Sequence, residues 1–186
     1  MADVIMARRR SALAGVSLPV KDGVAAVADD GPVSRFIYRG APEAIAAAFG
    51  VAPSTVPMKA AANGDRAALW LGPDEWLLLA PVTDGVALRD TLSASLIDQP
   101  ASLVDVGHRQ LGLAVKGPRA AGLINAGCPL DLDLAAFPVG MCTRTILAKA
   151  DVVLWRTAED AFHIEVWRSF APYVIEFLRE ALFGVD

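Results

Sequence analysis

The stretch LWLGPDEWLLLAP, residues 69–81, predicts a β-hairpin whose strands are apolar on both faces. Such a hairpin is either buried between two layers or presents one face to another chain. We expect it to lie between the helices of its own half and the rest of the protein, and a subunit contact on part of one face is the alternative. With a loop at Gly72–Glu75, the expected pairs are Leu71 with Trp76 and Trp70 with Leu77.

The chain contains the same order of elements twice. RFIYRGAPEAIAAAF, residues 35–49, predicts a strand, a turn with Gly40 and Pro42, and a helix that ends at Gly50. LGLAVKGPRAAGLINAG, residues 111–127, repeats that order. Each unit precedes a hairpin and then an amphipathic helix, and the Leu-Trp pair of the first hairpin returns at residues 154–155.

This duplication predicts an α+β fold in which two imperfect ferredoxin-like (split βαβ) halves form one body. We divide the chain into a partly extended N-terminal arm at residues 1–32, a first α+β half at 33–108 and a second half at 109–186. Residues 102–106 supply the closing strand of the first half, whereas the second half ends without room for one. A further strand is expected at residues 143–148.

The second hairpin has a different pattern from the first. Its strand at residues 162–167 alternates apolar residues with His163, Glu165 and Trp167, which is typical of a strand with one face in water. In the helix that follows, Ser169 is expected to be the N-cap. An apolar stripe of that helix should face the core, and it comprises Phe170, Val174, Phe177, Leu178 and Leu182.

Several residues are candidates for a subunit interface, because tryptophan, tyrosine and arginine are favoured at interface centres. For the group around Trp167, the alternative is the packing of a strand end onto the last helix. The candidates are Trp70, Trp76, Arg109, Trp167, Arg168, Phe170 and Tyr173.

Composition and motifs argue against several classes of function. The net charge is −4 and the only basic run is Arg8–Arg10, so we expect no nucleic-acid surface. The apolar run after it is too short for a membrane span, which predicts a cytoplasmic protein. The sequence has no G-x-S-x-G elbow, P-loop or G-x-G-x-x-G cradle, so we assign no catalytic, cofactor or metal residue.

Three small groups of cysteine or polar residues could suggest a site, but each also has an ordinary structural explanation. Cys128 and Cys142 lack a zinc-ligand spacing, and we expect both to be reduced packing residues. Asp131 and Asp133 would share a face as a carboxylate pair, but an edge or loop is the preferred interpretation. Asp105, His108 and Arg109 form the most site-like group, for which a turn or a subunit contact is preferred to a general base.

Long runs of the sequence resemble the gamma subunit family of heterotetrameric sarcosine oxidase. They are LGPDEWLLLAP, the segment from DVGHRQLGLAVKGPRAAG to VVLWRT, and FHIEVWRSFAPYVIEFL, and the resemblance runs from about residue 68 to residue 182. The resemblance implies a small subunit without its own cofactor, whose partners are the alpha, beta and delta subunits. It implies that the complex demethylates sarcosine to glycine with oxygen and tetrahydrofolate. FAD, FMN, NAD and folate sites would belong to alpha and beta, and zinc to delta.

A more distant similarity joins residues 105–166 to the folate-binding aminomethyltransferases of the glycine cleavage system. That family has a working aspartate shortly after the hairpin, whereas this chain reads WRSFAPYVIEF there, with Glu176 as the nearest acid. The departure weakens the case for folate chemistry but not for the shared fold. A stand-alone aminomethyltransferase-like protein and a small-ligand regulatory module remain the alternative functions.

Overall fold

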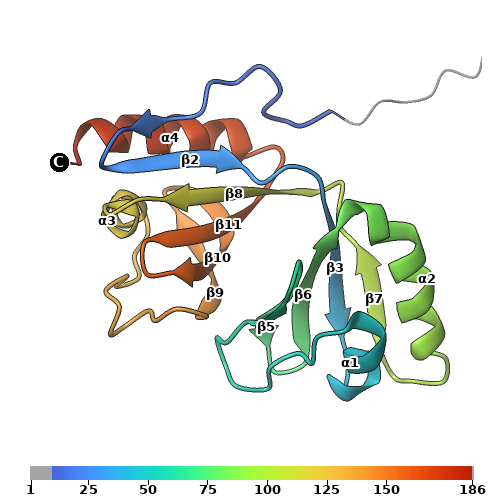
Figure 1. Ribbon diagram of the computed structural model, residues 1–186. Helices are drawn as coiled ribbons and strands as arrows, with labels where there is room; N and C mark the ends of the chain where they lie inside the picture. Colours follow the sequence, from blue (N-terminus) through green and yellow to red (C-terminus); the bar gives the residue numbers. More distant parts are fainter. Residues whose placement is uncertain (1–9, 186) are drawn as a thin grey trace, which may run out of the picture.

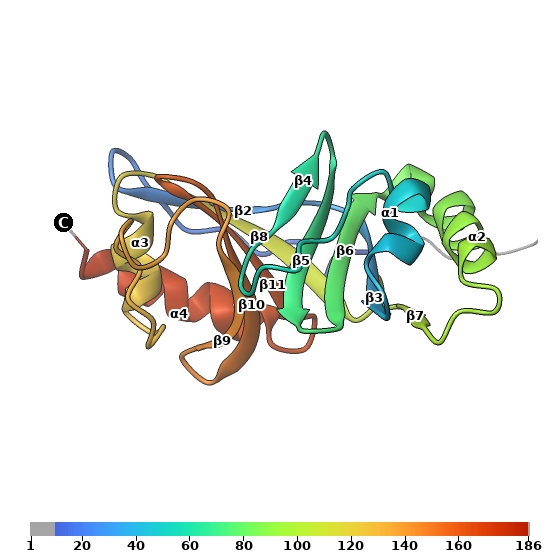
Figure 2. The ribbon, with the colours of Figure 1, turned by 90° about the horizontal axis from the view of Figure 1, so that it is seen from below.

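The computed structural model describes residues 10–185, which form four stacked layers (Figures 1 and 2). Two helices cover the outer face of one antiparallel sheet, and two others cover the outer face of a second sheet. The inner faces of the sheets pack against each other through a third apolar cluster. The predicted α+β class is confirmed. In the described residues, no helix is both long and apolar enough to cross a membrane.

The two sheets repeat one arrangement. Their strand orders are β4-β5-β6-β3-β7 and β1-β2-β8-β11-β10-β9. The first half contains β3 (Val33–Arg39), α1 (Glu43–Phe49), β4 (Ala61–Asn63), β5 (Arg66–Gly72), β6 (Glu75–Pro81), the 3₁₀ turn η1 (Val82–Asp84), α2 (Gly85–Ser95) and β7 (Ser102–Asp105). The second sheet and its helices contain β1 (Val20–Lys21), β2 (Ala25–Asp29), β8 (Gln110–Lys116), α3 (Ala120–Asn125), β9 (Cys142–Leu147), β10 (Ala150–Ala158), β11 (Ala161–Trp167) and α4 (Ala171–Phe183).

In each half, one strand is inserted between the two strands that a helix connects, as in a split βαβ unit. Strand β6 lies between β3 and β5, and β11 lies between β8 and β10. Helix α1 ends, as expected, at Gly50, whose φ of 76° places it in the left-handed region that favours glycine. The strand expected at residues 143–148 is β9, which begins and ends one residue earlier.

The β5–β6 hairpin lies between two apolar layers, as its apolar faces predicted. Ala68 and Leu78 belong to the cluster beneath α1 and α2, whereas Leu69 and Leu77 belong to the cluster between the sheets. The expectation that this hairpin separates the helices of its own half from the other half is therefore confirmed.

The predicted register of this hairpin was wrong by one residue. Trp70 pairs with Trp76 and Gly72 pairs with Glu75, and the register shifts between Trp70 and Gly72. The turn is shorter than predicted, and the bulge at Leu71 inserts one residue into β5. Trp70 and Trp76 are therefore directly opposite each other, and Trp76 faces the helices of its own half, where its ring stacks on Tyr38 with 6.0 Å between ring centroids.

The closing strand that the second half lacks comes from the N-terminal segment. Strand β7 closes the first sheet beside β3, and β2 takes the equivalent place beside β8, antiparallel to it. Val27 of β2 is only 2% exposed in the core beneath α3 and α4. Residues 20–29 are therefore part of the second sheet, and the division into segments 1–32, 33–108 and 109–186 remains a proposal.

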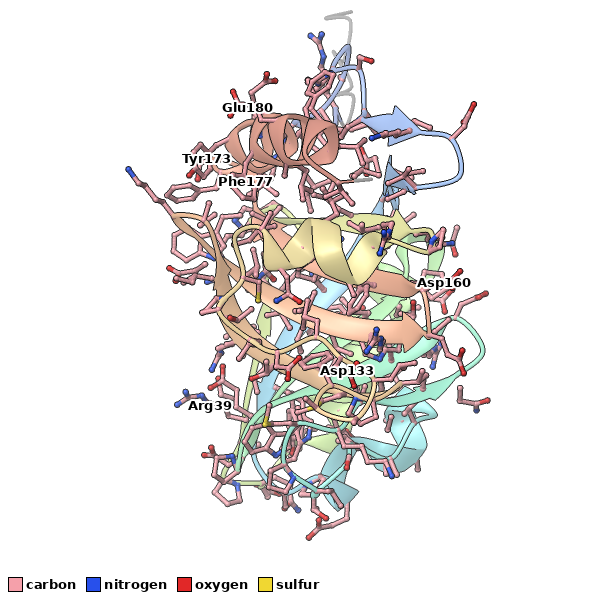
Figure 3. All side chains as sticks on the ribbon, turned by 90° about the vertical axis from the view of Figure 1, so that its left-hand side faces the viewer. Arg39, Asp133, Asp160, Tyr173, Phe177 and Glu180 are labelled. Atoms are coloured by element: carbon pink, nitrogen blue, oxygen red, sulfur yellow. The ribbon has the colours of Figure 1, made fainter. Side chains whose placement is uncertain are left out.

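The N-cap of helix α4 lies one residue later than predicted. Phe170 is its N-cap and makes no side-chain capping hydrogen bond, so Ser169 does not cap the helix. Val174, Leu178 and Leu182 of the predicted stripe are buried, but Phe170 is 41% exposed because it precedes the first helical turn. Figure 3 shows Tyr173 and Glu180 on the same helix, and both are exposed.

We predict that Val27→Ala lowers the free energy of unfolding by about 2 kcal/mol, because it removes two buried methyl groups from the second core. Val20→Ala in β1 is the matched control, since Val20 is 61% exposed, and should change stability little. Urea unfolding monitored by tryptophan fluorescence measures both. Equal effects of the two substitutions would contradict the assignment of β2 to the folded core.

Candidate functional site

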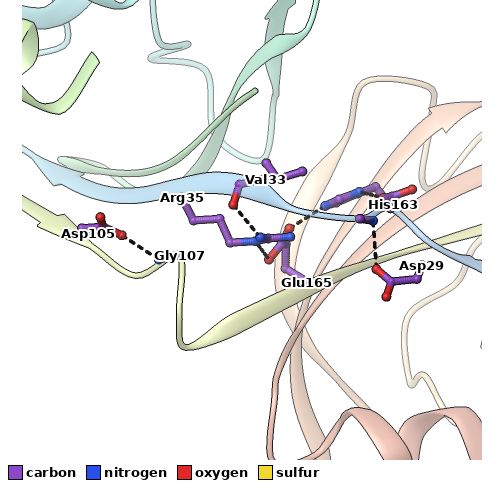
Figure 4. Close-up of polar contacts among 9 residues, drawn as sticks. Asp29, Val33, Arg35, Asp105, Gly107, His163 and Glu165 are labelled. Atoms are coloured by element: carbon purple, nitrogen blue, oxygen red, sulfur yellow. Dashed lines mark hydrogen bonds and ion pairs between the residues drawn. The ribbon is translucent and has the colours of Figure 1, made fainter. Parts of the chain in front are cut away.

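A chain of charged side chains, buried except for Asp30, joins the two halves (Figure 4). Arg35 of β3 donates through Nε to Oε2 of Glu165 on β11, at 2.6 Å. Oε1 of the same carboxylate lies 2.9 Å from Nε2 of His163, whose Nδ1 lies 2.6 Å from Oδ2 of Asp30. Arg35 is 2% exposed and Glu165 is fully buried. We call Arg35, Glu165, His163 and Asp30 the inter-sheet charge cluster.

The charge states in this cluster support one another. Burial acts to lower the pKa of His163, but the hydrogen bonds and charges of Asp30 and Glu165 outweigh it and raise that pKa to about 9. Burial acts to raise the pKa of Glu165, but His163 and Arg35 outweigh it and lower that pKa. His163 is therefore protonated and Glu165 ionised at neutral pH, and such pairing is how buried charges are tolerated in a protein.

The polar face of β11 is buried, contrary to the half-solvated strand that its alternation predicted. His163 is 9% exposed, and Glu165 is completely covered. The face is covered by the first half, whose strand β3 carries Arg35 to the carboxylate. A sequence signal for this pairing was available, because Arg35 lies between the apolar residues Val33 and Ile37 on the face of β3 that packs against the cluster between the sheets.

Gly112 leaves room for the inter-sheet charge cluster. A Cβ at this position of β8 would lie 2.8 Å from Cε1 of His163 and 3.0 Å from Nη2 of Arg35. Both distances are shorter than ordinary van der Waals contact, so a side chain would displace the ring or the guanidinium. The glycine in the β8 strand thus has a steric role that periodicity does not reveal.

A second ion pair connects the halves at the end of the first hairpin. Glu75 of β6 accepts hydrogen bonds from Arg39 of β3, at 2.6 Å, and from Arg144 of β9. Burial acts to raise the pKa of Glu75, but these two arginines outweigh it and lower the pKa. The turn of the first hairpin is thereby tied to the second sheet.

The other polar candidates have structural roles in turns. Oδ1 of Asp105 accepts a hydrogen bond from the backbone N–H of Gly107 at 2.8 Å, and His108 is exposed. The carboxylates of Asp131 and Asp133 each accept a backbone N–H two residues further along the chain. These contacts are those of Asx turns and agree with the preferred interpretation of both groups.

The two cysteines are free thiols that pack in the interior, as predicted. Both are buried, Cys128 beneath the helices of the second half and Cys142 between the sheets. Burial raises the pKa of the Cys142 thiol to about 12, which leaves it protonated and unreactive. In the described part of the chain, no three His, Cys, Asp or Glu side chains are placed to hold a metal ion.

Five of the predicted interface residues are exposed and lie where β11 meets α4 and just before β8. Trp167 ends β11, and Phe170 and Tyr173 belong to the start of α4, with exposed fractions of 45%, 41% and 41%. The Arg109 guanidinium lies 5.4 Å from the centroid of the Trp167 ring, and the backbone N–H of Arg168 donates to the carbonyl of Arg109 at 2.9 Å. We call Arg109, Trp167, Arg168, Phe170 and Tyr173 the arginine–aromatic face.

The two tryptophans of the first hairpin do not belong to this face. Trp76, which we had included among the interface candidates, is fully buried, and its Nε1 donates to the carbonyl of Ser54 at 2.9 Å. This excludes Trp76 from contact with another chain in the folded state. Trp70 is half-buried and contacts the apolar clusters on both sides of the first sheet. Trp76 shares with Leu78 and Ala80 the face of β6 that packs beneath the helices.

The geometry of the inter-sheet charge cluster suits a lock between halves better than a reaction centre. Both carboxylate oxygens of Glu165 and both ring nitrogens of His163 already have partners. A general base must reach the proton that it abstracts, and Glu165 is fully covered. The arrangement therefore stabilises the contact between the sheets.

Comparison with known proteins connects the chain to one family. A model described as "Sarcosine oxidase, gamma subunit family" matches residues 40–183. Sarcosine oxidase subunit gamma of Corynebacterium sp. (strain P-1) is 36% identical over 140 residues, which cover 75% of this chain and 68% of the relative. The protein of the same name from Corynebacterium sp. (strain U-96) is 38% identical over 75% of this chain and 67% of its own length.

Solved structures give the same connection. A chain of the heterotetrameric sarcosine oxidase from Corynebacterium sp. U-96, in complex with pyrrole 2-carboxylate, superposes with a TM-score of 0.87 at 30% identity, and the match covers 95% of both chains. Aminomethyltransferase T of the glycine cleavage system from Bartonella henselae gives a TM-score of 0.65 at 14% identity, over 84% of this chain and 45% of that one. The second similarity concerns the fold alone.

We predict that Glu165→Gln lowers the free energy of unfolding by about 3 kcal/mol, because it leaves Arg35 and His163 buried without their shared anion. Glu176→Gln is the matched control. Glu176 is exposed on α4, where it pairs only with Arg179, so its loss should cost less than about 1 kcal/mol. Guanidinium unfolding at neutral pH measures both, and equal costs would contradict the structural role of the cluster.

We also predict a stability change with pH that depends on His163. Its folded pKa of about 9 exceeds the ordinary value of 6.5, so its contribution is complete below pH 6.5 and is lost as the pH rises through 9. The neutral ring would place an unprotonated nitrogen against a carboxylate. Urea unfolding at a series of pH values should show this loss in the wild type and not in His163→Gln. The same pH profile in both proteins would contradict the prediction.

Proposed function

This chain belongs to the sarcosine oxidase gamma subunit family, and from that premise we propose that it is a non-catalytic subunit that supports assembly of the larger flavoprotein chains. The observation that carries the proposal is the match to a chain of a heterotetrameric sarcosine oxidase over 95% of both chains. Similarity over nearly the whole chain, and not over a single motif, is expected of a subunit that contributes its overall shape to a complex.

In the complex that we propose, the partners are the alpha, beta and delta subunits. FAD, FMN, NAD and tetrahydrofolate would bind to alpha and beta, and zinc would bind to delta. The assembly would act in the cytoplasm and oxidatively demethylate sarcosine to glycine. The polar groups of this chain support a role without chemistry, because the most deeply buried charges have mutual partners and the remaining carboxylate candidates close turns.

The similarity to aminomethyltransferases does not extend to a folate site. Glu176, the acid nearest to the place where that family has its working aspartate, is exposed on α4 and its Oε2 accepts a hydrogen bond from Arg179 at 3.1 Å. A carboxylate in that environment is solvated and ion-paired, so it lacks the enclosed setting in which a substrate amine would meet it.

Co-expression tests the proposed assembly role. We expect the alpha, beta and delta subunits expressed with this chain to elute as one species in size-exclusion chromatography, with sarcosine oxidase activity in the same fractions. Omission of this chain should reduce both the assembled species and its activity. A fully active assembly of the other subunits without this chain would contradict the proposal.

Calorimetry separates the proposal from the folate-dependent alternative. Titration of the isolated chain with tetrahydrofolate should release no heat of binding, because the proposal places the folate site in a partner subunit. A saturable isotherm with the isolated chain would favour the aminomethyltransferase-like alternative.

A further inference from the structure

The arginine–aromatic face carries positive charge that the chain itself does not neutralise. Among residues 10–185, Arg10, Arg109 and Arg168 have no carboxylate within ion-pair distance. Arg168 donates only to the backbone carbonyl of Arg10, at 3.0 Å, and Arg109 lies over the Trp167 ring. Since the net charge of the chain is −4, this concentration of cations is a local exception.

Two recesses open beside this face at the boundary between the halves. The first, of about 180 Å³, is lined by Arg10 and Arg168 together with the buried residues Arg35 and Gln110. Asp29 also lines it, but its oxygens already accept hydrogen bonds from Ser11 and Gly31. The second recess, of about 340 Å³, is lined by residues that include Arg109, Gln110, Arg144, Glu165 and Trp167.

Polar atoms at the base of the first recess lack partners. Nη2 of Arg35 and Oε1 of Gln110 are buried and make no hydrogen bond within the described chain, although the two residues are only 2% and 8% exposed. Buried polar atoms without a partner are uncommon in native proteins. The recess therefore lies beside two unpartnered polar atoms, and its largely apolar lining includes the guanidinium-bearing residues Arg10 and Arg168.

We propose that the arginine–aromatic face, extended by Arg10, binds an acidic segment of a partner subunit, with one carboxylate seated between Arg10 and Arg168 at the opening of the first recess. This inference rests on the proposed function as an assembly subunit. A guanidinium binds a carboxylate through parallel hydrogen bonds, and Trp167, Phe170 and Tyr173 provide the aromatic area that protein interfaces favour.

Charge complementarity selects this occupant over a second copy of the chain. A two-fold contact through the same face would bring identical unpaired arginines together, and like charges across an interface are unfavourable. An acidic segment instead supplies the carboxylates that Arg10, Arg109 and Arg168 lack within the chain.

A charge-reversal variant tests the proposal. The combined substitutions Arg109→Glu and Arg168→Glu change two exposed positions of the face. The control combines Arg89→Glu and Arg119→Glu, which make the same change in net charge on α2 and just before α3. Arg109 precedes the first residue of β8, whereas Arg119 follows its last residue, so the two arginines lie at opposite ends of this strand. The exposed Arg89–Asp90 pair contributes little to stability. Equal thermal midpoints of the three proteins establish that all are folded.

The readout is retention of this chain by affinity-tagged alpha subunit after co-expression of the complete complex. We expect wild type and control to be retained equally, and the face variant to be retained at least about tenfold less. Retention of wild type should also fall as salt is raised, because exposed charge pairs are screened. Equal retention of the face variant, retention independent of salt, or self-association of the wild-type chain that the face variant abolishes would overturn the proposal.

A separate outcome concerns the function itself. If wild-type chain is not retained by the tagged subunit at any salt concentration, the assembly role fails before the face is tested. The neutral pair Arg109→Gln and Arg168→Gln, measured in parallel, should lie between wild type and the charge-reversal variant. Retention of the neutral pair equal to that of wild type would overturn the role of the two guanidinium groups.

Discussion

The contact between Arg35 and Glu165 constrains how the two halves of this protein meet. The residues are separated by 130 positions in the sequence and lie on different sheets, yet their buried side chains come within 2.6 Å. A buried carboxylate without cations would be strongly unfavourable, so the relative position of the sheets that brings Arg35 to Glu165 is favoured, while His163 reaches Glu165 from the same strand. The apolar cluster between the sheets supplies attraction without direction, whereas these hydrogen bonds specify position.

The same constraint explains two features of the surrounding strands. Gly112 faces the cluster because any larger residue would touch the His163 ring and the Arg35 guanidinium. Strand β2 leads directly to Asp30, whose carboxylate completes the partners of His163, and the chain then passes into β3, which carries Arg35. A closing strand for the second sheet at the C-terminal end of the chain would have no such connection. The N-terminal strand thus closes one sheet and links it to the other.

The sequence was sufficient for the elements that depend on local patterns. The duplicated order of strand, helix, hairpin and helix, the buried β5–β6 hairpin and the closing strand β7 all follow from apolar periodicity and turn residues. It was insufficient where a distant segment decides the outcome. The alternation of β11 is the same whether Glu165 meets water or Arg35, and the bulge in β5 that shifts the register of the first hairpin is not indicated by its turn residues. The pairing of β2 with β8 joins two distant segments, and the sequence pattern of neither segment predicts it.

Arginines with and without partners occupy different environments in this chain, and the difference follows from desolvation. Arg35 and Arg156 are almost completely buried, and the first has a carboxylate while the second donates to three backbone carbonyls. Arg109 and Arg168 are exposed, so water stabilises their charges and the folded chain bears little cost for leaving them unpaired. Removing that water at an interface is favourable only if carboxylates replace it. An exposed group of unpaired arginines around Trp167 can therefore be covered selectively by an acidic surface, because a neutral or basic surface would desolvate the same charges without compensation.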